Sequence, residues 1–204
     1  MKNELRETKK FISENLKKIF FFVMISMVVI VLVSGFNFYM NPNSAQELIK
    51  VIKEQMSGLL DNDVGLLSAK IFLNNLFACA IAIGLGFVPL FCLPAISLIS
   101  NAVIIGALFG YGEAMGTMNS FESFLFGMLP HGIFELPAIF LSISMGIYLC
   151  RVITGKIMGR GKAGVLITLN NIARVYVLVV IPLLIIAAVV EGYVTPYIIG
   201  MAGI

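Results

Sequence analysis

The chain has a single histidine, and a carboxylate follows it at helical spacing in an otherwise apolar stretch. His131 and Glu135 stand four residues apart within residues 129–138, so their side chains share one face if a helix begins at Pro130. A third ionisable residue, Glu191, stands near the end of another apolar stretch. Ionisable groups inside a bilayer are costly and usually functional. These three residues are therefore our candidates for a polar intramembrane cluster.

Three kinds of chemistry fit such a cluster. The side chains can hydrogen-bond and tie helices together, they can carry a proton or a substrate, or they can hold a metal ion. Zinc sites need three or four ligands and the HExxH motif is absent, so we predict no metal and no cofactor. No serine lies beside His131 in a G-x-S-x-G motif, and Cys150 falls at the other end of the same stretch. We therefore do not expect an enzyme.

Asparagines are the next polar residues of interest. Asn74 and Asn75 begin one apolar stretch, and Asn101 lies near the middle of the next. Asparagine side chains hydrogen-bond between helices in membranes. We therefore expect Asn75 or Asn101 close to the three ionisable residues.

The composition indicates that these residues lie in a membrane protein. Of 204 residues, 59% are apolar and 12% are charged, against about 45–50% and about 25% in soluble domains. The net charge of +3 gives no reason to expect a nucleic-acid partner. The three cysteines have no C-x-x-C spacing, so they are interpreted as buried hydrophobic residues. The protein is expected to be embedded in a lipid bilayer.

Gaps between charged residues predict the membrane spans. Residues 19–46 and 71–112 carry no formal charge, and about 20 apolar residues cross a hydrocarbon core of about 30 Å. The second gap is long enough for two spans, with a hairpin expected at Gly84, Gly86, Pro89 and Pro94. We predict an all-α, polytopic membrane helix bundle of about five transmembrane helices, at residues 19–40, 71–90, 93–112, 131–150 and 175–194. Pro130 predicts a broken segment over residues 121–129, before the fourth span.

Basic residues predict the orientation. Residues 1–18 carry six Lys or Arg, and residues 151–174 carry five with no acidic residue, so both segments are expected in the cytoplasm. The protein is then a multi-pass protein of the cell membrane, with its N-terminus cytoplasmic and its C-terminus extracytoplasmic. Residues 1–18 form a basic segment, residues 19–204 a single transmembrane domain, and residues 151–174 a cytoplasmic loop.

Residues 44–60 have an amphipathic pattern on the outer side. Ser44 and Glu47 have the spacing of a capping box, which predicts a helix starting there. This helix could lie on the bilayer, lie on its own protein, or dock a partner. Elsewhere, Gly106 and Gly110 match the G-x-x-x-G packing motif, which leaves a homo-oligomer open.

Several of these residues also carry a family resemblance. Residues 129–138, with Pro130, His131, Gly132, Glu135 and Pro137, resemble the hallmark segment of the stage II sporulation protein M family, integral membrane proteins of bacteria and archaea. Further signatures of that family are matched, in the same order, at Asn74, Asn75, Pro89, Asn101, Glu191, Thr195 and Pro196. The resemblance covers residues 15–200 and implies that Asn75, Asn101, His131, Glu135, Glu191, Thr195 and Pro196 belong to one shared feature.

The resemblance implies a function exercised through partners. The family's namesake acts in sporulation with a peptidoglycan-degrading enzyme and its membrane-anchored companion, and it is not known as an enzyme. We therefore expect a subunit that recruits or anchors an envelope-remodelling complex. Other members resemble the membrane component of circular-bacteriocin clusters, which implies a transport or export subunit working with a separate ATPase, since this chain has no P-loop motif. An intramembrane metal-dependent hydrolase is the third hypothesis.

Overall fold

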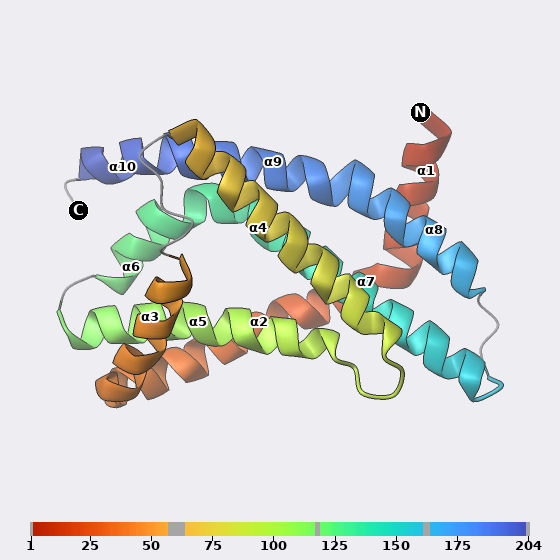
Figure 1. Ribbon diagram of the computed structural model, residues 1–204, viewed down its shortest axis with the longest axis horizontal. Helices are drawn as coiled ribbons and strands as arrows, with labels where there is room; N and C mark the ends of the chain where they lie inside the picture. Colours follow the sequence, from red (N-terminus) through yellow and green to blue (C-terminus); the bar gives the residue numbers. More distant parts are fainter. Residues whose placement is uncertain (1, 57–63, 117–118, 161–163, 203–204) are drawn as a thin grey trace. The chain divides into compact units, whose positions relative to one another are not determined.

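The chain is mostly helical and has no β-strand over the residues that the computed structural model describes, which are 2–56, 64–116, 119–160 and 164–202 (Figure 1). The elements in chain order are α1 (Lys2–Phe11), η1 (Ile12–Leu16), α2 (Lys17–Met40), α3 (Pro42–Met56), α4 (Val64–Gly84), η2 (Leu85–Phe87), α5 (Pro94–Ala114), α6 (Ser120–Glu122), η3 (Ser123–Met128), α7 (Leu129–Ile157), α8 (Val165–Val175), η4 (Tyr176–Val180), α9 (Ile181–Val189), η5 (Val190–Val194) and α10 (Thr195–Ala202). Of the η segments, η2 is a 3₁₀ turn and the other four are π-helical.

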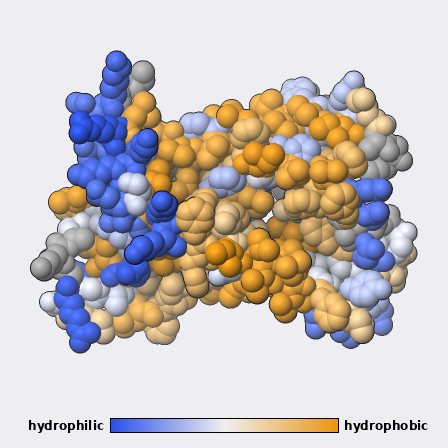
Figure 2. Space-filling model, turned by 180° about the vertical axis from the view of Figure 1, so that it is seen from behind, coloured by the Kyte–Doolittle hydropathy of each residue, from blue (hydrophilic) through white to orange (hydrophobic). Residues whose placement is uncertain are grey.

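Five helical stretches are long and apolar enough to cross a membrane. They are Lys2–Met40, Gly65–Phe87, Pro94–Ala114, Phe124–Ile157 and Val165–Ile198. Each overlaps one of the predicted spans, so the all-α membrane class and the number of spans are confirmed. Hydrophobic residues cover most of the face drawn in Figure 2, as expected of a surface in contact with lipid. The direction in which the chain crosses the membrane stays a prediction.

Three of the four π-helical turns stand just before a proline. Segments η3, η4 and η5 end two residues ahead of Pro130, Pro182 and Pro196. A proline has no N–H to donate and its ring collides with the carbonyl group four residues back. A wider turn accommodates this defect without ending the helix. The segment that we expected to be broken before the fourth span is therefore helical from Ser120 onward, with a π-turn at the predicted break.

Two compact units can be distinguished. Unit 1 comprises Met1–Ile25, Asn75–Leu98 and Glu135–Leu184. The largest fully buried side chains of the described residues belong to it, among them Leu16, Ile143, Met145, Leu149 and Leu184. Unit 2 comprises Ser26–Asn74, Ile99–Phe134 and Ile185–Ile204.

The hairpin between the second and third spans is part of unit 1. After α4 ends at Gly84, the turn η2 follows, and α5 begins at Pro94, where proline is favoured as a first helical residue. A Cβ atom on Gly86 would overlap the carbonyl oxygen of Gly146 in α7, so a glycine is required for this approach. Gly84, by contrast, has open space around its Cα.

Glycines also determine how α2 packs on α5 within unit 2. A Cβ atom on Gly106 would overlap Ser34 Oγ, and one on Gly110 would overlap the carbonyl oxygen of Gly35. Helix α2 of the same chain therefore packs against the G-x-x-x-G motif of α5. This packing leaves no role for the motif in the homo-oligomer that the sequence left open.

Two predicted segment boundaries differ from the structure. The outer amphipathic helix, expected over residues 44–60, begins at Pro42, and Ser44 already lies in its first turn, so the Ser44 capping box was wrong. Proline at the first helical position fits the earlier start. Residues 57–60 lie outside the described ranges. Residues 151–174, expected as a loop, are helical as far as Ile157 and again from Val165.

Candidate functional site

The first half of the candidate site is the start of α7. This helix begins at Leu129 directly after η3, and Pro130 occupies its second position, where the preceding π-turn accommodates the missing N–H. His131 and Glu135 follow one turn apart on the same helix. His131 belongs to unit 2, and Glu135 directly follows the last residue of that segment, Phe134.

The second half is the π-helical turn η5, which contains Glu191. Pro196 follows this turn, and the hydroxyl of Thr195 donates a hydrogen bond of 3.3 Å to the carbonyl oxygen of Val190. This bond spans five residues, as in a π-turn, and supplies a donor next to the position where proline has none. Thr195 is buried. Its hydrogen bond and the following Pro196 therefore stabilise the π-turn in which Glu191 lies.

The two halves meet. One ligand atom from each of His131, Glu135 and Glu191 lies within 4.8 Å of the other two. All three side chains are partly buried, and they come from stretches that are apolar enough to span a membrane. The structure thus brings together the three ionisable residues that sequence spacing and expected depth had suggested.

One atom of this cluster is unsatisfied. His131 Nδ1 is buried and has no hydrogen-bond partner in the described part of the chain. A buried nitrogen without a partner costs about 1–3 kcal/mol, so such atoms are rare in folded proteins and need an explanation. The lone pair or the proton on this nitrogen is available to a ligand.

The arrangement has three chemical uses. The carboxylates can accept hydrogen bonds from the imidazole, the group can take up and release a proton, and the two oxygens with one nitrogen can coordinate a divalent cation. The three residues of the cluster are an imidazole and two carboxyl groups, and none of them carries a hydroxyl or thiol nucleophile.

The remaining residues of the predicted feature occupy several elements. Asn74 and Asn75 lie in α4, where Asn74 is exposed and Asn75 is partly buried, and Asn101 lies partly buried in α5. Their closeness to the cluster stays a prediction. Pro89 lies in the hairpin after η2, Gly132 is buried in the first turn of α7, and Pro137 lies inside α7, which continues past it.

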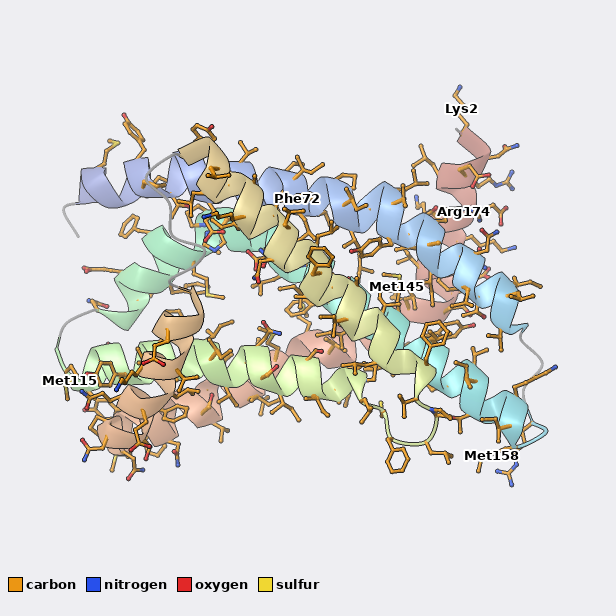
Figure 3. All side chains as sticks on the ribbon, viewed as in Figure 1. Lys2, Phe72, Met115, Met145, Met158 and Arg174 are labelled. Carbon is orange, nitrogen blue, oxygen red and sulfur yellow. The ribbon has the colours of Figure 1, made fainter. Side chains whose placement is uncertain are left out.

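Sequence reasoning missed a set of polar contacts made by the N-terminal segment in unit 1. The hydroxyl of Tyr148 in α7 donates a hydrogen bond of 2.9 Å to Asn15 Oδ1, and the Tyr148 ring packs edge-on against Phe11. Arg174 of α8 forms an ion pair with Glu4 of α1, and Figure 3 shows Arg174 beside that helix. A tyrosine hydroxyl in an apolar span is the signal that would have indicated a buried partner.

Comparisons with known proteins agree with this picture. The family model described as "Stage II sporulation protein M" matches residues 18–196. An uncharacterized protein of Methanocaldococcus jannaschii is 28% identical over 201 residues, covering 94% of this chain and 87% of the relative. No solved structure matches the chain. The matched region includes α7, η5 and the hairpin, and the chain belongs to the stage II sporulation protein M family.

Proposed function

We propose that this protein is a non-enzymatic membrane subunit that recruits or anchors an envelope-remodelling complex. The observation that carries the proposal is the two-sided character of α3, a helix expected on the outer side of the membrane. Its apolar face is already in use, since Ala45 and Ile49 are buried within unit 2. Its opposite face, with Gln46, Glu47 and Lys50, is exposed.

Because the apolar face of α3 is buried in the protein, docking of a partner is favoured over contact with the bilayer as the role of this helix. A helix that lies on lipid keeps its apolar side toward the acyl chains, whereas Ala45 and Ile49 contact the protein instead. The exposed polar face then has a fixed position, so a partner can recognise it without an entropic cost for ordering the helix. Mixed charges on such a face favour a protein partner with complementary groups.

Site-specific photocrosslinking in intact cells tests this proposal. A photoreactive residue at Gln46 should crosslink to a protein with an extracytoplasmic domain, and Glu47→Lys combined with Lys50→Glu should abolish that crosslink by reversing the local charges. A photoreactive residue at Phe36, which is exposed on the membrane-spanning α2, is the matched control and should reach lipid only. Identical crosslinks at both positions would contradict a docking role for α3.

A transport or export subunit is the second candidate, and the intramembrane cluster favours it. Titratable groups inside membranes often line the path of a proton or a substrate. Energy would come from a separate ATPase, because the chain has no P-loop motif. An ATPase copurifying through the cytoplasmic segments, together with export that fails in Glu135→Gln, would favour this candidate over recruitment.

A further inference from the structure

We propose that His131, Glu135 and Glu191 bind one divalent transition-metal ion of the zinc class, which holds the start of α7 to the π-turn η5. The donor set is one imidazole nitrogen and two carboxylate oxygens. Imidazole excludes the hard cations Mg²⁺ and Ca²⁺, which prefer oxygen alone, and the absence of thiolate excludes Cu⁺. Zn²⁺ accepts this combination and leaves a fourth position for water.

The distances fit this ion. Ligand atoms around a tetrahedral Zn²⁺ are about 3.4 Å apart, given bonds of about 2.1 Å. The three ligand atoms lie within 4.8 Å of one another. The distances between them must therefore shorten by less than about 1.5 Å for all three to coordinate one ion. Rotation about side-chain torsions supplies movements of this size without displacing the backbone.

The unsatisfied nitrogen indicates where the ion binds. His131 Nδ1 is buried without a hydrogen-bond partner among the described residues, and neutral imidazole coordinates metals through either ring nitrogen. A metal ion would occupy this lone pair and remove the cost of leaving it bare.

A divalent ion would balance the charges of the ionised cluster. Two ionised carboxylates in apolar surroundings need two positive charges nearby. The chain contains no Lys or Arg in residues 124–150 or 176–204, so His131 is the one basic residue of these two apolar stretches, and its imidazolium would supply one charge. A divalent ion with neutral His131 gives a net charge of zero, which is the cheapest state in a membrane.

The backbone at the cluster supports a built site. Glu191 lies inside η5, and η3 ends three residues before His131. π-Helical turns make up well under about 1% of residues and are concentrated at functional sites. The extra residue in such a turn rotates the following side chains, and here it accompanies the approach of Glu191 to α7.

Metal titration of the purified, full-length protein in lipid nanodiscs tests the proposal. After chelator treatment and dialysis, Zn²⁺ should bind with a stoichiometry of about one per chain and raise the Tm. Co²⁺ should give visible absorption bands typical of nitrogen and oxygen ligands. Glu191→Gln should weaken Zn²⁺ binding by at least about tenfold and abolish the Tm increase, while its metal-free Tm stays equal to or above that of wild type, because a buried charge is removed.

Two controls keep the outcome interpretable. Glu14→Gln, which removes an exposed carboxylate on η1, should bind Zn²⁺ as wild type does. His131→Asn should lose the cobalt bands if its nitrogen is a ligand, even when the fold is retained. Binding of Zn²⁺ by Glu191→Gln at wild-type affinity, or the absence of any metal-dependent Tm change in wild type, would overturn the proposal.

Discussion

Replacing one glycine at the hairpin should separate two closely packed helices, and a glycine two residues away provides the control. A Cβ atom on Gly86 would overlap the backbone of Gly146, and one on Gly146 would overlap the carbonyl oxygen of Ala82 and lie against Pro94. Backbone atoms inside a helix cannot move aside cheaply, so the helices themselves must shift. Gly84 has nothing within 4 Å of the same position.

The expected magnitudes have opposite signs. Overpacking of this kind costs about 1–3 kcal/mol, so Gly86→Ala should reduce the free energy of unfolding by about 2 kcal/mol and lower the Tm by about 4–8 °C for a chain of this length. Gly84→Ala meets no obstacle, and an alanine in a helix is favoured over glycine by about 0.5–1 kcal/mol. Its Tm should therefore stay the same or rise slightly.

Thermal unfolding in nanodiscs, followed by size-exclusion fluorescence, measures both variants. The double variant Gly86→Ala and Gly146→Ala adds a sharper test, because the first methyl group already separates the helices. Its destabilisation should be smaller than the sum of the two single effects, by about 0.5–3 kcal/mol. Equal Tm values for Gly84→Ala and Gly86→Ala would refute the close approach of these two segments.

Further outcomes are expected for Cys92, Tyr148 and Glu135. Cys92 is the exposed cysteine of the three, and in the predicted orientation it faces the cytoplasm; an impermeant maleimide should label it in inside-out vesicles and not in intact cells. Its labelling should accelerate with pH more than that of a free thiol, because partial burial and the neighbouring Cys150 raise the pKa of Cys92 and leave little thiolate at neutral pH. Tyr148→Phe should lower the free energy of unfolding by about 0.5–1.5 kcal/mol through loss of the bond to Asn15, measured by the same thermal assay. Glu135→Gln should keep stability near wild type whereas Glu135→Leu should lower it, and a Glu135→Leu variant as stable and active as wild type would exclude any role for this residue.

The spans and the cluster were predictable because they depend on local rules. Uncharged stretches of known length determined the number of crossings, and a spacing of four residues placed His131 and Glu135 on one face. The approach of Glu191 followed from counting the rise per residue along an expected span. None of these inferences requires knowledge of which helices pack together.

The N-terminal segment was harder to predict because its partners are distant in sequence. We expected residues 1–18 as a separate basic cytoplasmic segment, yet residues 2–18 continue as one helical stretch into the first span. Leu16 has 0% exposure, while Leu5 in the same segment is half exposed. The pattern alone cannot distinguish these two leucines, since burial of Leu16 depends on packing within unit 1.

The π-turns before the prolines have a consequence for comparing relatives. Each π-turn is equivalent to one residue inserted into an α-helix, and removing it would rotate the rest of the helix by about 100°. A relative that lacks the proline can lose this extra residue. The helix beyond the turn then presents a different face to its neighbours. Single-residue gaps in family alignments should therefore be absent from residues 190–194 wherever Glu191 and Pro196 are both kept, because a deletion there would change the direction of the Glu191 side chain. Such gaps should also be absent from residues 123–128, because a deletion there would turn the whole of α7 and carry His131 away from Glu191.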